Sequence, residues 1–161
     1  RNLPFARIGG AIERHNAHKD DPIQLRGGWT MDIETLYDAA QCGPDDIDLL
    51  QTYDDYPVIS MMQFEDLRFC AKGDGPQFVR DHDLTINGTF PHNTNGGQLS
   101  AGQAGAAGGF IGLVEAIRQV TNTAGPTQVK NANRAMVSGF GMINYDRGVC
   151  SSATILTGAD T

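Results

Sequence analysis

The sequence is short of positive charge. Its 161 residues include 12 Lys and Arg against 19 Asp and Glu, which gives a formal net charge of -7. Neutralising a nucleic-acid backbone takes a cluster of basic side chains, and the sequence has none, so we expect no nucleic-acid partner. The chain also lacks a run of about 18 apolar residues and a charged-then-apolar leader. We therefore expect neither a membrane span nor secretion.

Cysteine is scarce as well. Cys42, Cys70 and Cys150 are odd in number, far apart in the sequence and set among apolar neighbours. This pattern is typical of reduced, buried thiols in a cytoplasmic protein, and it does not indicate a disulfide framework. The chain has no Cys-x-x-Cys pair that would suggest a zinc site.

The four histidines have no metal-like spacing and no matched carboxylate or cysteine partner in the sequence. They are His15, His18, His82 and His92. We predict that each is a surface residue and that the chain binds no metal. Ser100 and Cys150 lack a nearby signature of an activating base, so a hydrolase triad is not indicated either.

Apolar residues make up 40% of the chain, enough to fill the core of one domain over residues 1–161. Apolar and small residues without helical period predict strands at 5–13, 47–52, 134–143 and 149–156. The last two are joined by a short polar stretch typical of a hairpin turn. Strands that alternate with helices and end in a hairpin indicate an α/β fold.

Two helices are predicted in the first half of the chain. Thr30 is expected to cap the first, whose apolar residues recur at helical spacing until Gly43 and Pro44 stop it. Pro57 suits the first turn of the second, which we expect to continue to Cys70. We interpret its methionines as core filler.

Residues 72–97 are rich in Gly, Pro, Asn and Asp and predict a long irregular loop. Residues 102–122 follow, with a run of small residues before an apolar stripe that includes Phe110, Leu113 and Ile117. Several glycines in one helical turn are costly unless backbone must approach a neighbour closely. We therefore predict that residues 102–122 form the most buried helix of the fold.

Three loops could carry chemistry. Residues 51–56 follow a buried strand, where open α/β sheets gather their ligands. Residues 93–103 deliver a Gly-rich turn to a helix N-terminus, whose N–H groups would favour a developing negative charge. Residues 144–148 offer a phenol, a carboxylate and a guanidinium in succession. Each loop also has a purely structural interpretation. A tyrosine of residues 51–56 could be a core residue, residues 93–103 could be a tight structural turn, and residues 144–148 could be a solvated loop.

Taken in order, these segments resemble the C-terminal half of thiolase-superfamily proteins. The similarity is greatest to sterol-carrier-protein type thiolases and to lipid-transfer-protein aldolases of steroid side-chain degradation. It rests on residues 42–48, 61–70 and 95–108, and the Gly-Gly-x-x-Ser-x-Gly segment at 96–102 is its most specific part. The resemblance implies a thiolase-like α/β half with a mixed sheet of close to five strands flanked by helices.

The departures from the thiolase pattern point away from ordinary thiolysis. Tyr53 and Asp54 stand where the family has a His-Asp pair, and Gln103 stands where it has the histidine base. The cysteine of the last loop is not evident, and Tyr145 lies close to its place. The resemblance therefore implies that Tyr53 and Tyr145 are catalytic. The implied oxyanion and substrate loop comprises Asp54, Asn95, Gly96, Gly97, Ser100, Gly102 and Gln103.

The function that this pattern implies is a carbon–carbon lyase. By retro-aldol chemistry it would cleave a β-hydroxyacyl-CoA from a steroid side chain to a ketone and a short acyl-CoA. CoA is then part of the substrate, and no cofactor is expected in this chain. One alternative is an acyl-CoA acyltransferase whose nucleophilic cysteine belongs to an N-terminal half. The other is a non-catalytic subunit that binds lipid or acyl-CoA.

The resemblance also predicts partners. In the family the two halves pack around a shared helical layer, so a lone half would expose a large apolar face. We expect obligate association, with a homodimer as the assembly. An OB-fold, zinc-ribbon protein is a further expected partner, since such proteins often accompany these relatives.

Overall fold

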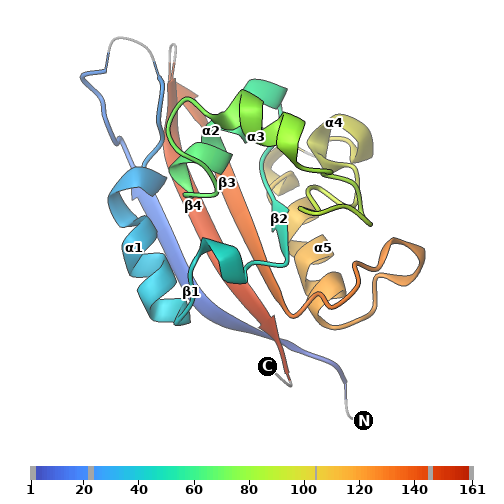
Figure 1. The fold of residues 1–161 in the computed structure, drawn as a ribbon. Helices are drawn as coiled ribbons and strands as arrows, with labels where there is room; N and C mark the ends of the chain where they lie inside the picture. Colours follow the sequence, from blue (N-terminus) through green and yellow to red (C-terminus); the bar gives the residue numbers. More distant parts are fainter. Residues whose placement is uncertain (1–2, 22–23, 104, 145–146, 160–161) are drawn as a thin grey trace.

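The computed structural model describes residues 3–21, 24–103, 105–144 and 147–159. Four strands form one mixed sheet in the spatial order β1-β4-β3-β2 (Figure 1). They are β1 Ala6–His15, β2 Leu49–Gln51, β3 Arg134–Asn144 and β4 Arg147–Gly158. β4 pairs antiparallel with β1 and β3, whereas β2 runs parallel to β3. The predicted α/β fold with a mixed sheet is confirmed, although the described residues form one strand fewer than expected.

Helices flank this sheet. Within the described ranges they are α1 Trp29–Ala40, α2 Pro57–Asp66, α3 Gly75–Asp81, α4 Gly97–Ala101 and α5 Phe110–Val120. Short 3-10 turns lie at Pro44–Asp46, Gly105–Ala107 and Gly125–Thr127. No helix in the described part of the chain is long and apolar enough to cross a membrane.

The alternation of side chains along the strands divides the core in two. Leu50 and Met136 belong to a cluster that includes residues of α1 and α2. Their neighbours Leu49 and Ala135 belong to a second cluster, which includes Ala116 of α5. Because successive strand residues point to opposite faces, α1 and α2 cover one face of the sheet and α5 covers the other (Figure 1).

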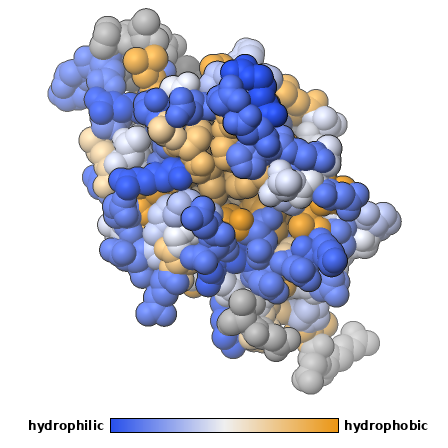
Figure 2. Space-filling view, in the orientation of Figure 1, coloured by the Kyte–Doolittle hydropathy of each residue, from blue (hydrophilic) through white to orange (hydrophobic). Residues whose placement is uncertain are grey.

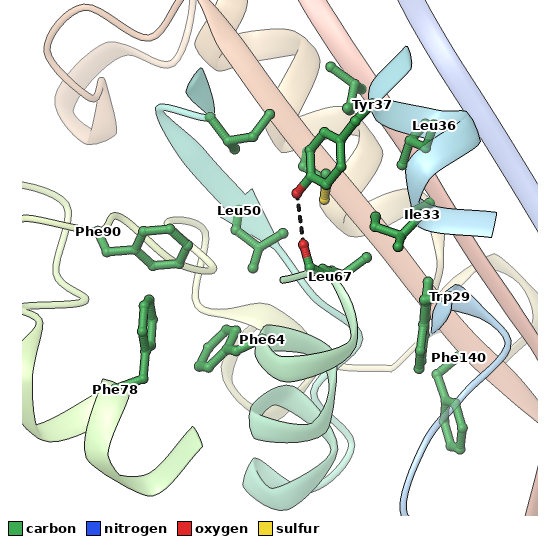
Figure 3. Packing of buried hydrophobic residues seen from close by; sticks show 14 residues of the cluster. Trp29, Ile33, Leu36, Tyr37, Leu50, Phe64, Leu67, Phe78, Phe90 and Phe140 are labelled. Atoms are coloured by element: carbon green, nitrogen blue, oxygen red, sulfur yellow. Dashed lines mark hydrogen bonds between the residues drawn. The ribbon is translucent and has the colours of Figure 1, made fainter. Parts of the chain in front are cut away.

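Aromatic side chains fill the first cluster (Figure 3). Trp29 stacks on Phe140 with 5.9 Å between ring centroids, and Phe64 packs on Phe78 at 5.4 Å. The Tyr37 hydroxyl donates a 2.8 Å hydrogen bond to the Leu67 carbonyl, which satisfies a polar atom inside the cluster. Together these contacts fix α1 and α2 on the sheet and so position the segment that follows β2.

The predicted boundaries of α1 and α2 are wrong in part. α1 begins at Trp29 and not after Thr30, whose hydroxyl donates to the Gly27 carbonyl at 3.0 Å and therefore does not cap the helix. The helix ends at Ala40, and its C-cap residue Gln41 adopts a left-handed conformation before Gly43 is reached. α2 ends at Asp66, short of the predicted Cys70.

The prediction of one irregular stretch over residues 72–97 is wrong in part. It contains α3, a seven-residue helix that opens with Gly75 and Pro76. Gly and Pro mark loops in a sequence, but Pro is also favoured in the first turn of a helix. Phe78 on α3 is buried against the aromatic core, which supplies the burial that a short helix needs.

The prediction that residues 102–122 form the most buried helix is also wrong. α5 starts only at Phe110, and the small-residue run before it includes a 3-10 turn. Ala116 and Val120 are buried, whereas Phe110 is 62% exposed and Ile117 is 39% exposed. The helix covers the sheet with one side, and within the described part of the chain no element covers its other apolar side.

Candidate functional site

Tyr53 follows β2 and is held through its backbone. Its N–H donates to the Ser138 carbonyl on β3 at 3.1 Å. The fully buried side chain of Gln63, on α2, donates to the Tyr53 carbonyl at 2.7 Å and accepts a 2.6 Å bond from the Ser138 hydroxyl. Gln63 thus links the sheet, α2 and Tyr53, and so fixes the backbone position of the tyrosine.

The Tyr53 phenol meets Gln103. The Gln103 Nε2 donates a 2.5 Å hydrogen bond to the Tyr53 hydroxyl, across 50 positions in the sequence. Burial raises the pKa of Tyr53, and the nearby Asp55 carboxylate raises it further, while the Gln103 bond opposes them. The phenol is therefore neutral at physiological pH and has a proton to donate, since an ordinary tyrosine already titrates near pH 10.

Asp54 anchors the Gly-rich turn. Its buried carboxylate accepts a 2.5 Å hydrogen bond from the Gln98 N–H. Gly97 has a φ of +63°, and a Cβ there would lie 2.0 Å from the Asp54 Oδ2. Only glycine fits this contact, because both the left-handed backbone and the missing side chain are needed.

The amides of this turn are already engaged. The Gly97 N–H donates to the Asn95 side chain at 2.9 Å, and the Gly96 N–H donates to the Asn93 carbonyl at 2.7 Å. Together with the Gln98 amide they close the turn, so their N–H groups hold the loop and are not free for an anion. Asn95 also donates to the Ile111 carbonyl at 3.1 Å, which fastens the turn to α5.

Ser100 and Gly102 lie between this turn and Gln103. The Ser100 N–H donates to the Gly96 carbonyl at 3.2 Å, and the serine is exposed on α4. Gly102 ends α4 with a φ of +102°, a conformation that favours glycine and redirects the chain into Gln103. The Gly-rich segment therefore acts as a support that delivers the Gln103 amide to Tyr53.

A cavity of about 910 Å³ opens beside Tyr53. This is near the upper end of the usual size range for small-molecule sites. Its apolar wall comes largely from α2 and the β3–β4 pair, and Figure 2 shows apolar surface near α2. The apolar and aromatic lining residues include Leu25, Tyr56, Val58, Ile59, Met61, Met62 and Phe140. Met62 also packs on the core as predicted, but both methionines line the cavity.

The hairpin reaches the same cavity. Gly141 on β3 and Gly148 on β4 line it together with Tyr53. Tyr145 lies outside the described residues, so its side chain has no described position. Asp55, Glu65 and Lys72 supply charged groups to the lining.

His92 is a site feature that the sequence did not reveal. Its Nε2 bonds the Thr52 hydroxyl at 2.7 Å, and the Thr52 hydroxyl bonds that of Ser60 at 2.9 Å. The imidazole packs edge-on against Phe64, and its burial lowers the pKa of His92 to about 4. The prediction of a surface histidine is therefore wrong for His92. Only the fold could reveal this enclosure, because the groups around the ring come from α2 and from Thr52, just after β2.

Comparisons with known proteins identify relatives of this chain. Residues 10–155 match the family described as Thiolase C-terminal domain-like. The chain is 36% identical over 129 residues to a steroid side-chain-cleaving aldolase of Thermomonospora curvata, which covers 79% of this chain and 30% of that protein. It is 25% identical over 134 residues to the benzoylsuccinyl-CoA thiolase subunit BbsB of Thauera aromatica. This match covers 82% of this chain and 35% of that protein.

A solved structure is also similar. The Ltp2-ChsH2(DUF35) aldolase matches with a TM-score of 0.82 and 30% sequence identity, over 100% of this chain and 42% of that chain. The chain thus spans about a third of the length of the two curated relatives and under half of the solved chain.

Proposed function

The chain belongs to the Thiolase C-terminal domain-like family, and on that premise we propose that it is the C-terminal half of a carbon–carbon lyase that cleaves a β-hydroxyacyl-CoA. One observation carries the proposal: the neutral phenol of Tyr53, held by the Gln103 amide at the edge of a large apolar cavity. Gln103 cannot accept a proton from a thiol, which disfavours thiolysis through an acyl-enzyme.

The proposed reaction is a retro-aldol cleavage. The β-hydroxyl gives its proton to a base, its oxygen becomes the carbonyl of a ketone, and the bond between the α and β carbons breaks. The electron pair of that bond passes to the thioester as an enolate, which then takes up a proton at carbon to give the shorter acyl-CoA. The site must hold the enolate oxygen and move two protons.

We assign Tyr53 to the developing oxyanion. Its hydroxyl accepts a hydrogen bond from Gln103 and keeps its own proton to donate, which suits a group that stabilises negative charge without becoming a base. Tyr145 is our proposal for the second catalytic group. Gly141 and Gly148 line the cavity that Tyr53 also lines, which supports placing the hairpin near the same substrate.

We propose a bulky, steroid side-chain derived acyl group as the substrate. The cavity volume and its apolar and methionine-rich wall suit a large hydrophobic ligand. Two relatives are named a steroid side-chain-cleaving aldolase and a 17-hydroxy-3-oxo-4-pregnene-20-carboxyl-CoA lyase, which supports the same choice.

The proposed assembly follows the relatives. The similar solved structure is named for two components, Ltp2 and ChsH2, which supports a partner protein beside this chain. We propose an OB-fold, zinc-ribbon protein and a second copy of the same protein as its partners. Cys42, Cys70 and Cys150 carry free thiols, which supports a reducing compartment such as the cytoplasm.

The decisive experiment replaces Tyr53 in the complete protein with its partners. Tyr53→Phe keeps the ring and deletes the hydroxyl, so folding should survive while the cleavage rate of a β-hydroxyacyl-CoA falls about 10²-fold or more. Tyr56→Phe is the matched control, because Tyr56 lines the same cavity and is exposed. It should cleave within about twofold of the parental rate.

Two outcomes would contradict the proposal. Equal rates for the parent and Tyr53→Phe would remove Tyr53 from the chemistry. Reaction of a 3-ketoacyl-CoA with free CoA, with no cleavage of the hydroxyacyl substrate, would favour the acyltransferase that the thiolase relative suggests. A parent that binds the hydroxyacyl-CoA but turns over neither substrate would favour the binding subunit.

A further inference from the structure

Three side chains that can ligate a metal meet on the β1–β4 pair. His15 lies directly opposite Cys150 in the strand register, and Glu13 lies two residues before His15 on the same face. The residue between them, Arg14, points the other way, because its guanidinium binds Asp32 of α1. Glu13, His15 and Cys150 therefore share the sheet face away from α1.

Their ligand atoms converge on one point. The Cys150 Sγ lies 3.8 Å from the His15 Nε2 and 3.9 Å from the Glu13 Oε1. The His15 Nε2 and the Glu13 Oε1 are hydrogen-bonded to each other, and all three atoms lie within 4.8 Å of one another. His15 uses the same nitrogen toward both partners, so the group is not arranged as a Cys-His-Glu relay, in which the carboxylate would bind the other ring nitrogen.

We propose that Glu13, His15 and Cys150 form a site for one divalent transition-metal ion of the Zn²⁺ class, with a fourth position open to water or another ligand. Tetrahedral Zn²⁺ with its usual bond lengths places a sulfur and a nitrogen ligand roughly 3.5 Å apart, close to the 3.8 Å between the Cys150 Sγ and the His15 Nε2. The metal would replace the proton between Glu13 and His15, and these two exposed side chains have room to separate.

The donor set and the backbone both suit this ion. One thiolate, one imidazole and one carboxylate are ligands that Zn²⁺ accepts, whereas Ca²⁺ and Mg²⁺ prefer oxygen alone. Binding releases the Cys150 thiol proton and the proton shared by His15 and Glu13. Cys150 stands on β4, which is paired on both sides, and Glu13 and His15 stand on the edge strand β1, which pairs with β4 up to His15.

The test uses the full-length polypeptide purified without the proposed zinc-ribbon partner, which would bring a metal site of its own; the protein is freed of metal by a chelator and titrated with Co²⁺ and then Zn²⁺. We expect one equivalent of Co²⁺ to bind with a near-ultraviolet thiolate-to-cobalt charge-transfer band, which Zn²⁺ then abolishes by displacement. Cys150→Ser should remove this band. His15→Ala and Glu13→Gln should each keep the fold and weaken Co²⁺ binding by about tenfold or more.

Cys42→Ser and Cys70→Ser are the matched controls, because both carry free, half-buried thiols outside the cluster. Each should keep the band and the Co²⁺ affinity of the parent. The proposal is overturned by a parent without the band, by a band that survives Cys150→Ser, or by one that a control variant removes. Should Cys150→Ser fail to fold, the two exposed variants decide, and unchanged Co²⁺ affinity in both would overturn the site.

Discussion

Tyr53 and Gln103 act as one hydrogen-bonded unit. The Gln103 amide donates to the phenol oxygen and fixes its position, while burial and Asp55 keep the phenol protonated by raising its pKa. A donor that is already in place before the reaction stabilises developing charge without having to reorganise. Such stabilisation is usually the largest single contribution to an enzyme's rate enhancement. Under the proposed function, the Gln103 amide orients the Tyr53 phenol and does not itself accept a proton.

His92 makes the stability of the protein depend on pH. Its neutral form is enclosed, and its pKa in the folded state is about 4, below the ordinary value of 6.5. Between these two pKa values the unfolded chain binds more protons than the folded chain. The contribution of His92 to the free energy of unfolding is therefore fully present above pH 6.5 and is lost as the pH falls toward 4. At pH 5 the loss from this one group is roughly 2 kcal/mol.

Urea unfolding of the parent and of His92→Gln at pH 7 and pH 5 checks this expectation. Glutamine keeps a polar side chain beside Thr52 but does not titrate. The difference in unfolding free energy between the two pH values should be about 2 kcal/mol smaller in the variant. An equal pH dependence in both proteins would show that His92 does not carry it.

At the scale of the element, replacing Gly97 tests how far the Gly96–Gly97 turn depends on close contact with Asp54. Gly97→Ala places a Cβ 2.0 Å from the Asp54 carboxylate in a left-handed backbone, so the turn must shift. We expect a loss of about 2 to 4 kcal/mol of unfolding free energy from strain and clash. Gln103 should move away from Tyr53, and the cleavage rate should fall together with the stability.

Gly105→Ala is the control for backbone strain alone. Gly105 also has a left-handed φ, +56°, but a Cβ there meets nothing within 4 Å. It should cost only about 1 kcal/mol and leave catalysis near the parental rate. Differential scanning calorimetry and the cleavage assay on both variants separate the two effects, and equal losses would mean that the Asp54 contact is unimportant.

The same elements show what local patterns can and cannot predict. The strands and α1 were predictable, because apolar spacing and turn residues act within a few positions. The exposure of Phe110 was not, because helical period says that α5 has an apolar side but not whether this chain supplies its partner. His92 and the Glu13–His15–Cys150 cluster depend on strand register and packing, which no sequence spacing records. Tyr53 and Gln103 were named as site residues only through the family resemblance, and their hydrogen bond was not predicted.

At the scale of the whole molecule, one side of the fold exposes large apolar side chains. α5 presents Phe110, Val114 and Ile117 to solvent at 62%, 53% and 39% exposure, and Ile8 on β1 is 70% exposed. Apolar groups of this kind on a single helix mark an interaction surface. The chain spans only about a third of the length of its curated relatives, and we propose that a region corresponding to the rest of those relatives covers α5.

Phe110→Asp tests whether α5 is covered in the complete protein. In this chain by itself the substitution should change little, because Phe110 is already exposed. Where a partner layer buries the position, an unpaired carboxylate should cost about 3 kcal/mol of unfolding free energy, and sedimentation should show dissociated or loosened assemblies. Met31→Asp on α1 is the matched control, since Met31 is 52% exposed on the opposite side of the sheet. The control should stay within about 0.5 kcal/mol of the parent. If Phe110→Asp behaves like Met31→Asp, nothing packs on α5, and the expectation of obligate association must be abandoned.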